Sequence, residues 1–341
     1  MSMAVGATFP SEFKRYADPA TELAVIRQTS PAFVSGLTAP HLRQFTKRVD
    51  AMVYWSERDG TRQIYRLDLK SGESKQLTGA AALDVTGFSL SPDDRYLYYF
   101  DGPVLQSVTS GLSKPRDVYK TPNGSDRTGL TVAADGTVLF GEGSRIIRVA
   151  LQKTGPIFEA DGKIDMVMAR PRHAQVVYRQ SGSFWIVNTD GTGKKQLSLA
   201  EKAGEAVWSP DGRTLLYLQI PDDPKQLVTL RENSPDDSMP GTTADQLVAR
   251  TSQFGTFAPN ADASVFVGAS RSKASAYIII LLRVTRRELT LCEHRASDPA
   301  MVSVVFAPDS QSIFFVSDRH GKPAIYRVPV EKFVEETSDQ G

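Results

Sequence analysis

The sequence is poor in cysteine and histidine, the residues that build disulfide frameworks and many metal sites, and its positive and negative charges nearly cancel. Of its 341 residues, one is cysteine (Cys292) and four are histidine, and the formal net charge is +1. A single cysteine excludes an intrachain disulfide, so we expect Cys292 to pack as a small apolar side chain. The balanced and scattered charge gives no electrostatic basis for binding nucleic acid.

Long hydrophobic runs are also missing. The longest, AYIIILL at residues 276–282, is far too short to cross a bilayer and instead predicts a buried strand. The first residues contain no apolar core of the length that a signal peptide needs. We therefore expect no contact with a membrane and a cytoplasmic location, which would become periplasmic only if the start of the chain were truncated.

The signature motifs of several large enzyme classes are absent. The chain has no G-x-S-x-G nucleophile elbow, no P-loop and no dinucleotide-binding fingerprint. Its S-P-D-G segment at residues 209–212 and the related segments, such as SPDD at 91–94, are turn sequences, because proline presets φ and Asp-Gly completes the turn. The serines of these segments are therefore not predicted to be nucleophiles.

What the sequence does contain is a repeated β unit, seen most clearly at residues 51–78, AMVYWSERDGTRQIYRLDLKSGESKQLT. This stretch reads as three short strands joined by two tight turns, with apolar and polar residues alternating along residues 63–69. A unit of this size cannot bury its own apolar faces, so it predicts neighbours of the same kind.

Similar strand starts, followed by S-P-D-G or a related turn, recur at steps of about 37 to 49 residues, a period typical of propeller blades. We predict one all-β domain over residues 1–341, a seven-bladed β-propeller with four-stranded antiparallel blades. The blades are expected to begin near Leu42, Thr86, Leu130, Met166, Ala206, Thr256 and Ser303. Residues 221–246, rich in Pro, Asp and Ser, interrupt the period in blade five and predict a long surface excursion.

The ring is predicted to close through its two ends. The seventh blade holds only three strands before a polar tail at residues 332–341, whereas the strand at residues 23–30 has no unit of its own before it. Pairing this N-terminal strand with the last blade would complete the blade and remove an exposed edge.

Residues 315–326, FVSDRHGKPAIY, resemble the last blade of the oligogalacturonate lyases, and residues 13–30 and the KQLT ending at 75–78 resemble parts of the same family. The resemblance implies an intracellular seven-bladed propeller that cleaves short pectin fragments by β-elimination. It also implies a divalent metal, usually manganese, held by histidines and a glutamine. The S-P-D-G units are shared with TolB-like propellers and do not choose between the two groups.

The residues at the family's functional positions differ in this chain. The resemblance places Asp298, Met301 and Ser303 at metal-ligand positions, and methionine and serine are poor replacements for imidazole at such a site. No histidine lies at residues 178–184, where the lyases carry their base. We therefore expect no metal and no cofactor here, although the family would use manganese. Arg170 matches an arginine that the lyases present to substrate.

Five residues are candidates for a site at the channel mouth. Arg170 and His41 are the candidate catalytic residues, and Arg170 has the alternative of bonding to carbonyls of adjacent blades. Glu205 and Asp298 occupy equivalent entries of blades five and seven, where carboxylates could act as acid and base or bind a cation, or pair with Arg170 and Arg250. Arg170, Glu205, Arg250 and Asp298 are the candidate substrate-binding residues.

Three functional interpretations remain open, because a fold alone argues poorly for function. The first is a divergent relative of the lyases that recognises an acidic oligosaccharide, a uronate, with or without turnover. The second is a non-catalytic TolB-like propeller that serves as a protein or peptide interaction scaffold. The third is a lyase acting on oligogalacturonate by β-elimination through a rebuilt site that uses Arg170, His41 and the carboxylates.

Overall fold

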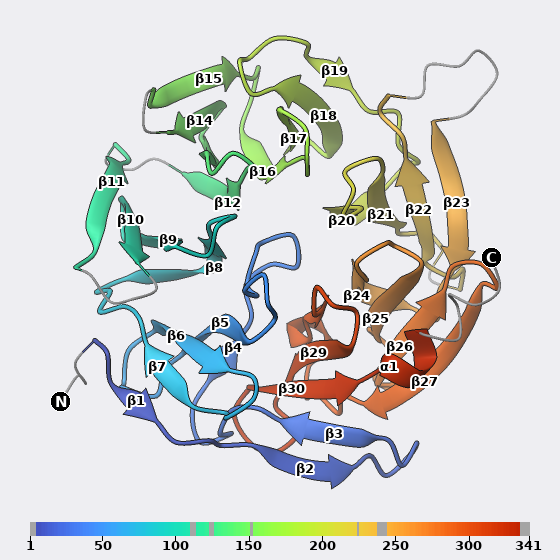
Figure 1. The fold of residues 1–341 in the computed structure, drawn as a ribbon. Helices are drawn as coiled ribbons and strands as arrows, with labels where there is room; N and C mark the ends of the chain where they lie inside the picture. The colour runs from blue at the N-terminus through green and yellow to red at the C-terminus, as the bar shows by residue number, and fades with distance from the viewer. Residues whose placement is uncertain are drawn as a thin grey trace.

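The computed structural model describes residues 5–109, 114–122, 126–150, 153–223, 225–236 and 244–334. Their strands form seven antiparallel sheets that stand around a common centre as the blades of a propeller (Figure 1). The helical elements of the described residues are two short ones, η1 (Pro299–Met301) and α1 (Glu331–Val334). The predicted all-β, seven-bladed fold is confirmed.

Each blade runs from an inner strand at the centre to an outer strand at the rim (Figure 1). Blade one is β4 (Ser35–Gly36), β5 (Ala51–Ser56), β6 (Gln63–Asp68), β7 (Ser74–Gln76) and β1 (Thr8–Phe9). Blade two is β8 (Leu83–Leu90), β9 (Tyr96–Asp101), β10 (Val104–Thr109) and β11 (Arg116–Lys120). Blade three is β12 (Arg127–Val132), β13 (Val138–Glu142), β14 (Arg145–Val149) and β15 (Gly155–Glu159).

The remaining blades follow the same order. Blade four is β16 (Ile164–Ala169), β17 (Gln175–Gln180), β18 (Ser183–Asn188) and β19 (Lys195–Gln196). Blade five is β20 (Ala203–Trp208), β21 (Leu215–Gln219), β22 (Thr229–Asn233) and β23 (Asp245–Arg250). Blade six is β24 (Phe254–Pro259), β25 (Val265–Ser270), β26 (Tyr277–Leu282) and β27 (Arg287–Glu293). Blade seven is β28 (Val304–Phe306), β29 (Ser312–Ser317), β30 (Ala324–Pro329), β3 (Ala24–Arg27) and β2 (Lys14–Ala17).

The S-P-D-G segment and its relatives form the turns that follow inner strands. In blade five the Ser209 hydroxyl donates to Asp211 Oδ1 at 2.6 Å and accepts from the Thr214 N–H at 3.0 Å. Gly212 takes a φ of +74°, a conformation that costs glycine little, and its N–H donates to the Ser209 carbonyl at 2.8 Å. These contacts reverse the chain and place the second strand beside the first.

The N-terminal segment closes the ring, as predicted. β3 pairs with β30 through Ile26 opposite Arg327 and Arg27 opposite Tyr326. β2 adds a fifth strand outside β3, and β1 pairs with β7 of the first blade. One continuous segment therefore joins the first blade to the last, which covers sheet edges at both (Figure 1).

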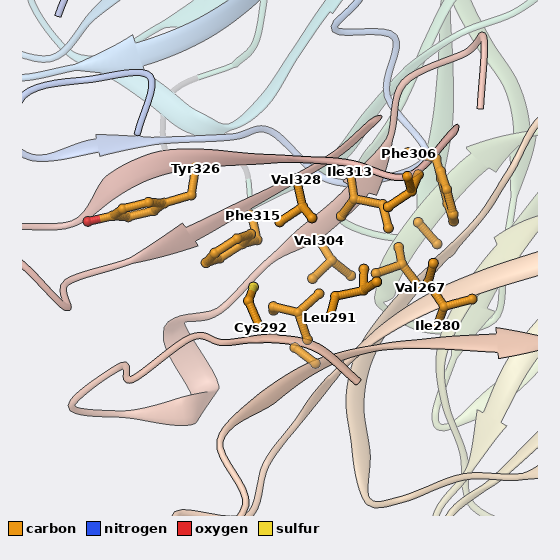
Figure 2. Close-up of a cluster of buried hydrophobic side chains, with 14 of the residues drawn as sticks. Val267, Ile280, Leu291, Cys292, Val304, Phe306, Ile313, Phe315, Tyr326 and Val328 are labelled. Atoms are coloured by element: carbon orange, nitrogen blue, oxygen red, sulfur yellow. The ribbon is translucent and has the colours of Figure 1, made fainter. Parts of the chain in front are cut away.

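Apolar side chains fill the spaces between blades. Figure 2 shows the cluster between blades six and seven, where Leu291 and Cys292 of β27 approach Val304 of β28 and Phe315 of β29. Val25 of the closing strand belongs to the same cluster and is fully buried. Cys292 is fully buried too, so it packs as the small apolar residue that we expected.

Residues 221–246 do not form the single surface excursion that their composition predicts. This stretch contains β22 and the beginning of β23, so it forms part of the sheet of blade five. Leu230 of β22 is fully buried, because the strand turns this apolar side chain toward the neighbouring blade. Residue 224 and residues 237–243 lie outside the described part, as do residues 335–341 of the expected tail. No helix of the described residues is long and apolar enough to cross a membrane.

Candidate functional site

Two cavities lie along the inner strands, at opposite ends of the central channel. The entry cavity, of about 420 Å³, is lined by residues where inner strands begin, including Glu205 of β20 and Thr256 of β24. The exit cavity, of about 340 Å³, is lined by residues where the same strands end, including Trp208 and Pro259. His41 lines both cavities and therefore lies between them.

The two cavities differ in chemistry. The exit cavity is walled mainly by proline and other apolar residues of the turns that follow the inner strands. The entry cavity carries one carboxyl group, two guanidinium groups and two hydroxyl groups, contributed by Glu205, Arg179, Arg271, Thr256 and Ser303. A concave site with a few convergent polar groups is the usual form of a small-molecule site, so the entry cavity is the candidate functional site.

Glu205 lies on β20 and is partly buried. Its Oε1 accepts a hydrogen bond from the Thr256 hydroxyl at 2.9 Å, and its carboxyl also accepts from the backbone N–H of Phe257. Burial raises the pKa of Glu205 to about 7, although these hydrogen bonds and the charge of Arg271 act in the opposite direction. Glu205 can therefore bind or release a proton close to neutral pH.

The two arginines of the entry cavity come from the ends of second strands. Arg179, on β17, donates to Asp165 Oδ1 at 2.6 Å. Arg271 follows β25, is exposed, and donates to the Gly255 carbonyl at 3.0 Å. No carboxylate of the described residues forms an ion pair with Arg271. Its guanidinium therefore keeps donors that an anionic ligand could use.

His41 lies in the channel between the cavities, on the segment that enters blade one. Burial lowers its pKa to about 4, so the imidazole is neutral at pH 7. Its Nε2 is buried and meets no hydrogen-bond partner among the described residues. A neutral imidazole in this position can exchange a hydrogen bond with a ligand or with water inside the channel.

Arg170 does not face the channel mouth, which corrects the expected placement. Its side chain is 1% exposed and lines neither cavity. Its Nε donates to the Gly212 carbonyl at 2.6 Å, and its Nη1 donates to Gln175 at 2.7 Å and to Asp236 at 3.0 Å. Its Nη2 donates a second hydrogen bond to Asp236, and the guanidinium lies over the Trp208 ring. The guanidinium is fully engaged in joining blades four and five, the structural alternative for this residue.

Arg250 and Asp298 also lie apart from the cavity lining. Arg250 is exposed at the end of β23, the outermost strand of blade five, so it cannot pair with Glu205 as expected. Asp298 is exposed and caps η1 by accepting from the Ala300 N–H at 2.9 Å. Ala300 itself lines the entry cavity, which places Asp298 just beyond its rim. Of the five candidates, the structure brings only His41 and Glu205 together.

The sequence reasoning missed Arg179, Arg271 and Thr256. Arg179 falls within residues 178–184, the region in which the lyases carry their histidine base. Arg271 immediately follows the second strand of its blade, and the chain turns there toward the channel face. The sequence feature that could have identified both residues is an arginine at or just after the end of the second strand in blades four and six.

The residues at the family's metal positions do not fit manganese. Met301 packs against the apolar cluster between blades six and seven, and the Ser303 carbonyl accepts the N–H of Val316 at 3.1 Å. The described residues include no group of three His, Cys, Asp or Glu side chains that could hold a metal ion. His294 uses both ring nitrogens, one with the Ser270 carbonyl and one with the Ala296 N–H. Hard divalent ions need several oxygen or imidazole donors together.

Comparison with known proteins agrees with the family inferred from the motifs. A family model described as oligogalacturonate lyase matches residues 3–153. The resemblance to the oligogalacturonate lyases is confirmed. The oligogalacturonide lyase of Pectobacterium atrosepticum and the oligogalacturonate lyase of Dickeya dadantii are each 24% identical to this chain, over 96% of the chain and 98% of the relative.

A solved structure of an oligogalacturonate lyase in complex with manganese shares the fold. It superposes with a TM-score of 0.87 at 23% sequence identity, over 98% of this chain and 100% of the other. The chain is thus an oligogalacturonate-lyase-like propeller along its whole length. The likeness to this structure, at 23% identity, is one of fold.

Proposed function

We propose that this oligogalacturonate-lyase-like propeller binds an acidic oligosaccharide, a uronate, in the entry cavity. The observation that carries the proposal is the exposed Arg271 guanidinium at a cavity of about 420 Å³, with no ion-pair partner among the described residues. A guanidinium binds a carboxylate through two parallel hydrogen bonds, which favours a planar carboxylate over a neutral hydroxyl. The cavity volume falls in the range of small-molecule sites.

Other lining groups support a sugar rather than a simple anion. Thr256 and Ser303 offer hydroxyl groups, and His41 offers a buried nitrogen without a partner, all of which can bond to sugar hydroxyls. The two bacterial relatives are lyases of oligogalacturonides, which are chains of an acidic sugar. These residues support recognition of the sugar, since the residues at the family's metal positions do not fit manganese.

Calorimetric titration with digalacturonate tests the proposal. We expect binding to the wild-type protein, and a loss of about 10- to 150-fold in affinity in Arg271→Gln, which corresponds to about 1.5–3 kcal/mol for a hydrogen bond to a charged group. The matched control is Arg287→Gln, an exposed arginine at the start of β27 in the same blade that lines neither cavity. We expect this control to bind as the wild type does.

A neutral disaccharide of galactose is the ligand control, because it presents hydroxyl groups without a carboxylate. Equal affinity for the neutral and the acidic disaccharide would contradict the role of Arg271. Absence of digalacturonate binding by the wild-type protein at millimolar concentration would remove the sugar-binding function and favour the interaction-scaffold interpretation.

A further inference from the structure

We propose that Glu205 is the proton-binding residue of the entry cavity, and that it takes up a proton when a carboxylate ligand occupies the cavity beside Arg271. This inference rests on the proposed function and adds the residue that couples binding to pH. It assigns to Glu205 a role as a hydrogen-bond donor to the bound acid, which an ionised carboxylate cannot have.

The geometry around Glu205 favours a carboxyl group that changes its protonation state. One oxygen, Oε1, is held by the Thr256 hydroxyl at 2.9 Å, so the side chain has a fixed orientation on β20. No lysine or arginine of the described residues forms an ion pair with it. Burial disfavours the ionised form more than the two hydrogen bonds and the charge of Arg271 stabilise it, which is why the pKa lies at about 7.

Among the charged and titratable groups around the cavity, Glu205 is the one that can change its protonation state near neutral pH. Arg271 approaches from blade six, and Arg179 approaches from blade four already paired with Asp165. His41, from the segment before blade one, is neutral because burial lowers its pKa to about 4. Asp298 lies beyond the rim as the cap of η1. Near the start of β20, Lys202 and Asp222 pair with each other.

A bound carboxylate shifts the protonation equilibrium of Glu205 toward the protonated form. Arg271 is the charged group that favours the ionised form of Glu205, and a ligand carboxylate on its guanidinium would cancel that influence. The ligand also brings a second negative charge into the cavity and displaces water from it. Two carboxylates in one site cannot both remain ionised at low cost, so one of them retains a proton. Glu205 is the group whose pKa is already near neutral.

Proton transfer is the only chemical change, because no covalent bond to carbon is made or broken. One proton moves from buffer to a Glu205 carboxylate oxygen as the ligand binds, and the resulting O–H donates to an oxygen of the ligand. The ligand leaves with its own carboxylate ionised, and Glu205 returns the proton to buffer. Ligand affinity must therefore fall as the pH rises above neutral.

Titration calorimetry with digalacturonate in two buffers of different ionisation enthalpy measures this proton directly. For the wild-type protein at pH 8 we expect uptake approaching one proton per ligand, and an affinity that falls about tenfold per pH unit above neutral. Glu205→Gln mimics the protonated side chain. We expect it to bind with no proton uptake and with an affinity that does not change between about pH 6 and 8.5.

Asp298→Asn is the matched control, since it neutralises the carboxylate just outside the cavity, and it should keep the proton uptake of the wild type. Wild-type binding without proton uptake, or uptake that persists in Glu205→Gln, would overturn the role of Glu205 while leaving the sugar-binding function intact. Failure of the wild type to bind at any pH would overturn the proposed function itself, and the inference with it. If Glu205→Gln does not fold, the two-buffer measurement on the wild type and Asp298→Asn still decides whether a proton is taken up.

Discussion

The Nε of Arg170 donates a hydrogen bond of 2.6 Å to the carbonyl oxygen of Gly212, 42 residues further along the chain. Gly212 is the glycine of the S-P-D-G turn in blade five, and a Cβ at this position would meet the Pro171 carbonyl oxygen at 2.1 Å. The arginine and its following proline in blade four therefore dock directly on the turn of blade five. This contact explains why Arg170 is buried between blades instead of facing a ligand.

Replacing Arg170 with lysine should lower the stability of the fold. Lysine can offer one ammonium group but cannot reach Gly212, Gln175 and Asp236 together, so buried acceptors lose their donors. We expect a loss of about 2–3 kcal/mol in the free energy of unfolding, with ligand affinity unchanged. Urea unfolding measures the first and titration calorimetry the second.

The control for this variant is Arg172→Lys, two residues away and exposed on the surface. Its stability should lie within about 0.5 kcal/mol of the wild type. A stable Arg170→Lys protein with weakened uronate binding would show that Arg170 acts on the ligand after all.

Removing residues 1–30 should destroy the closure of the ring. The deletion removes β1 from blade one and β2 and β3 from blade seven, which leaves the edge of β30 unpaired. It also takes away Asp18, which lies 3.5 Å from the buried guanidinium of Arg319. We expect a lower melting temperature and aggregation, detected by light scattering during size-exclusion chromatography.

Deleting residues 1–7 is the control, because it leaves β1, β2 and β3 in the chain. This shorter deletion should remain monodisperse. A monomeric protein without residues 1–30 that melts at the full-length temperature would contradict the closure argument.

Glu205 should make stability depend on pH between its unfolded and folded pKa values. Because its pKa rises from 4.5 to about 7 on folding, the folded state binds more protons in this interval. The stability that Glu205 contributes in its protonated form is present below the lower value and is lost as the pH rises through the higher one. We expect Glu205→Gln to exceed the wild type by about 2–3 kcal/mol at pH 8, and to match it near pH 4.5.

Urea unfolding at both pH values measures this difference, with Glu201→Gln as the control at an exposed glutamate four residues earlier. That control should show the pH dependence of the wild type. An equal stability of Glu205→Gln and wild type at pH 8 would mean that Glu205 is ionised in the folded protein without cost.

Manganese should not stabilise the protein. A ligand that binds only the folded state raises the melting temperature, and the described residues offer no cluster of donors for such an ion. We expect the melting temperature to be the same after chelation and after addition of manganese at about 100 µM, a concentration at which a site of micromolar affinity would contribute about 2.7 kcal/mol. A melting temperature that rises with manganese, and loses the rise in Asp298→Asn, would place a metal at the rim of the entry cavity.

The propeller itself was determined by local sequence. The alternation along β6, the S-P-D-G turns and the period between inner strands are short-range features, and each follows from backbone preferences and the need to bury one face of a strand. The closing strand could also be predicted, because the unpaired strand near Val25 and the incomplete last blade are complementary. The fold is shared with a solved structure at only 23% sequence identity and a TM-score of 0.87, since many sequences satisfy the same pattern.

Tertiary structure alone decided which polar residues share the entry cavity. Arg179 and Arg271 are separated by nearly two blades in the chain, and their meeting with Glu205 depends on how the ring brings strand ends together. Arg170 and Arg250 carry the same side chain as Arg271, yet one is buried against Gly212 and the other lies on the outer strand. A residue type indicates what chemistry is possible, but position around the ring determines whether a side chain reaches the ligand, another blade or solvent.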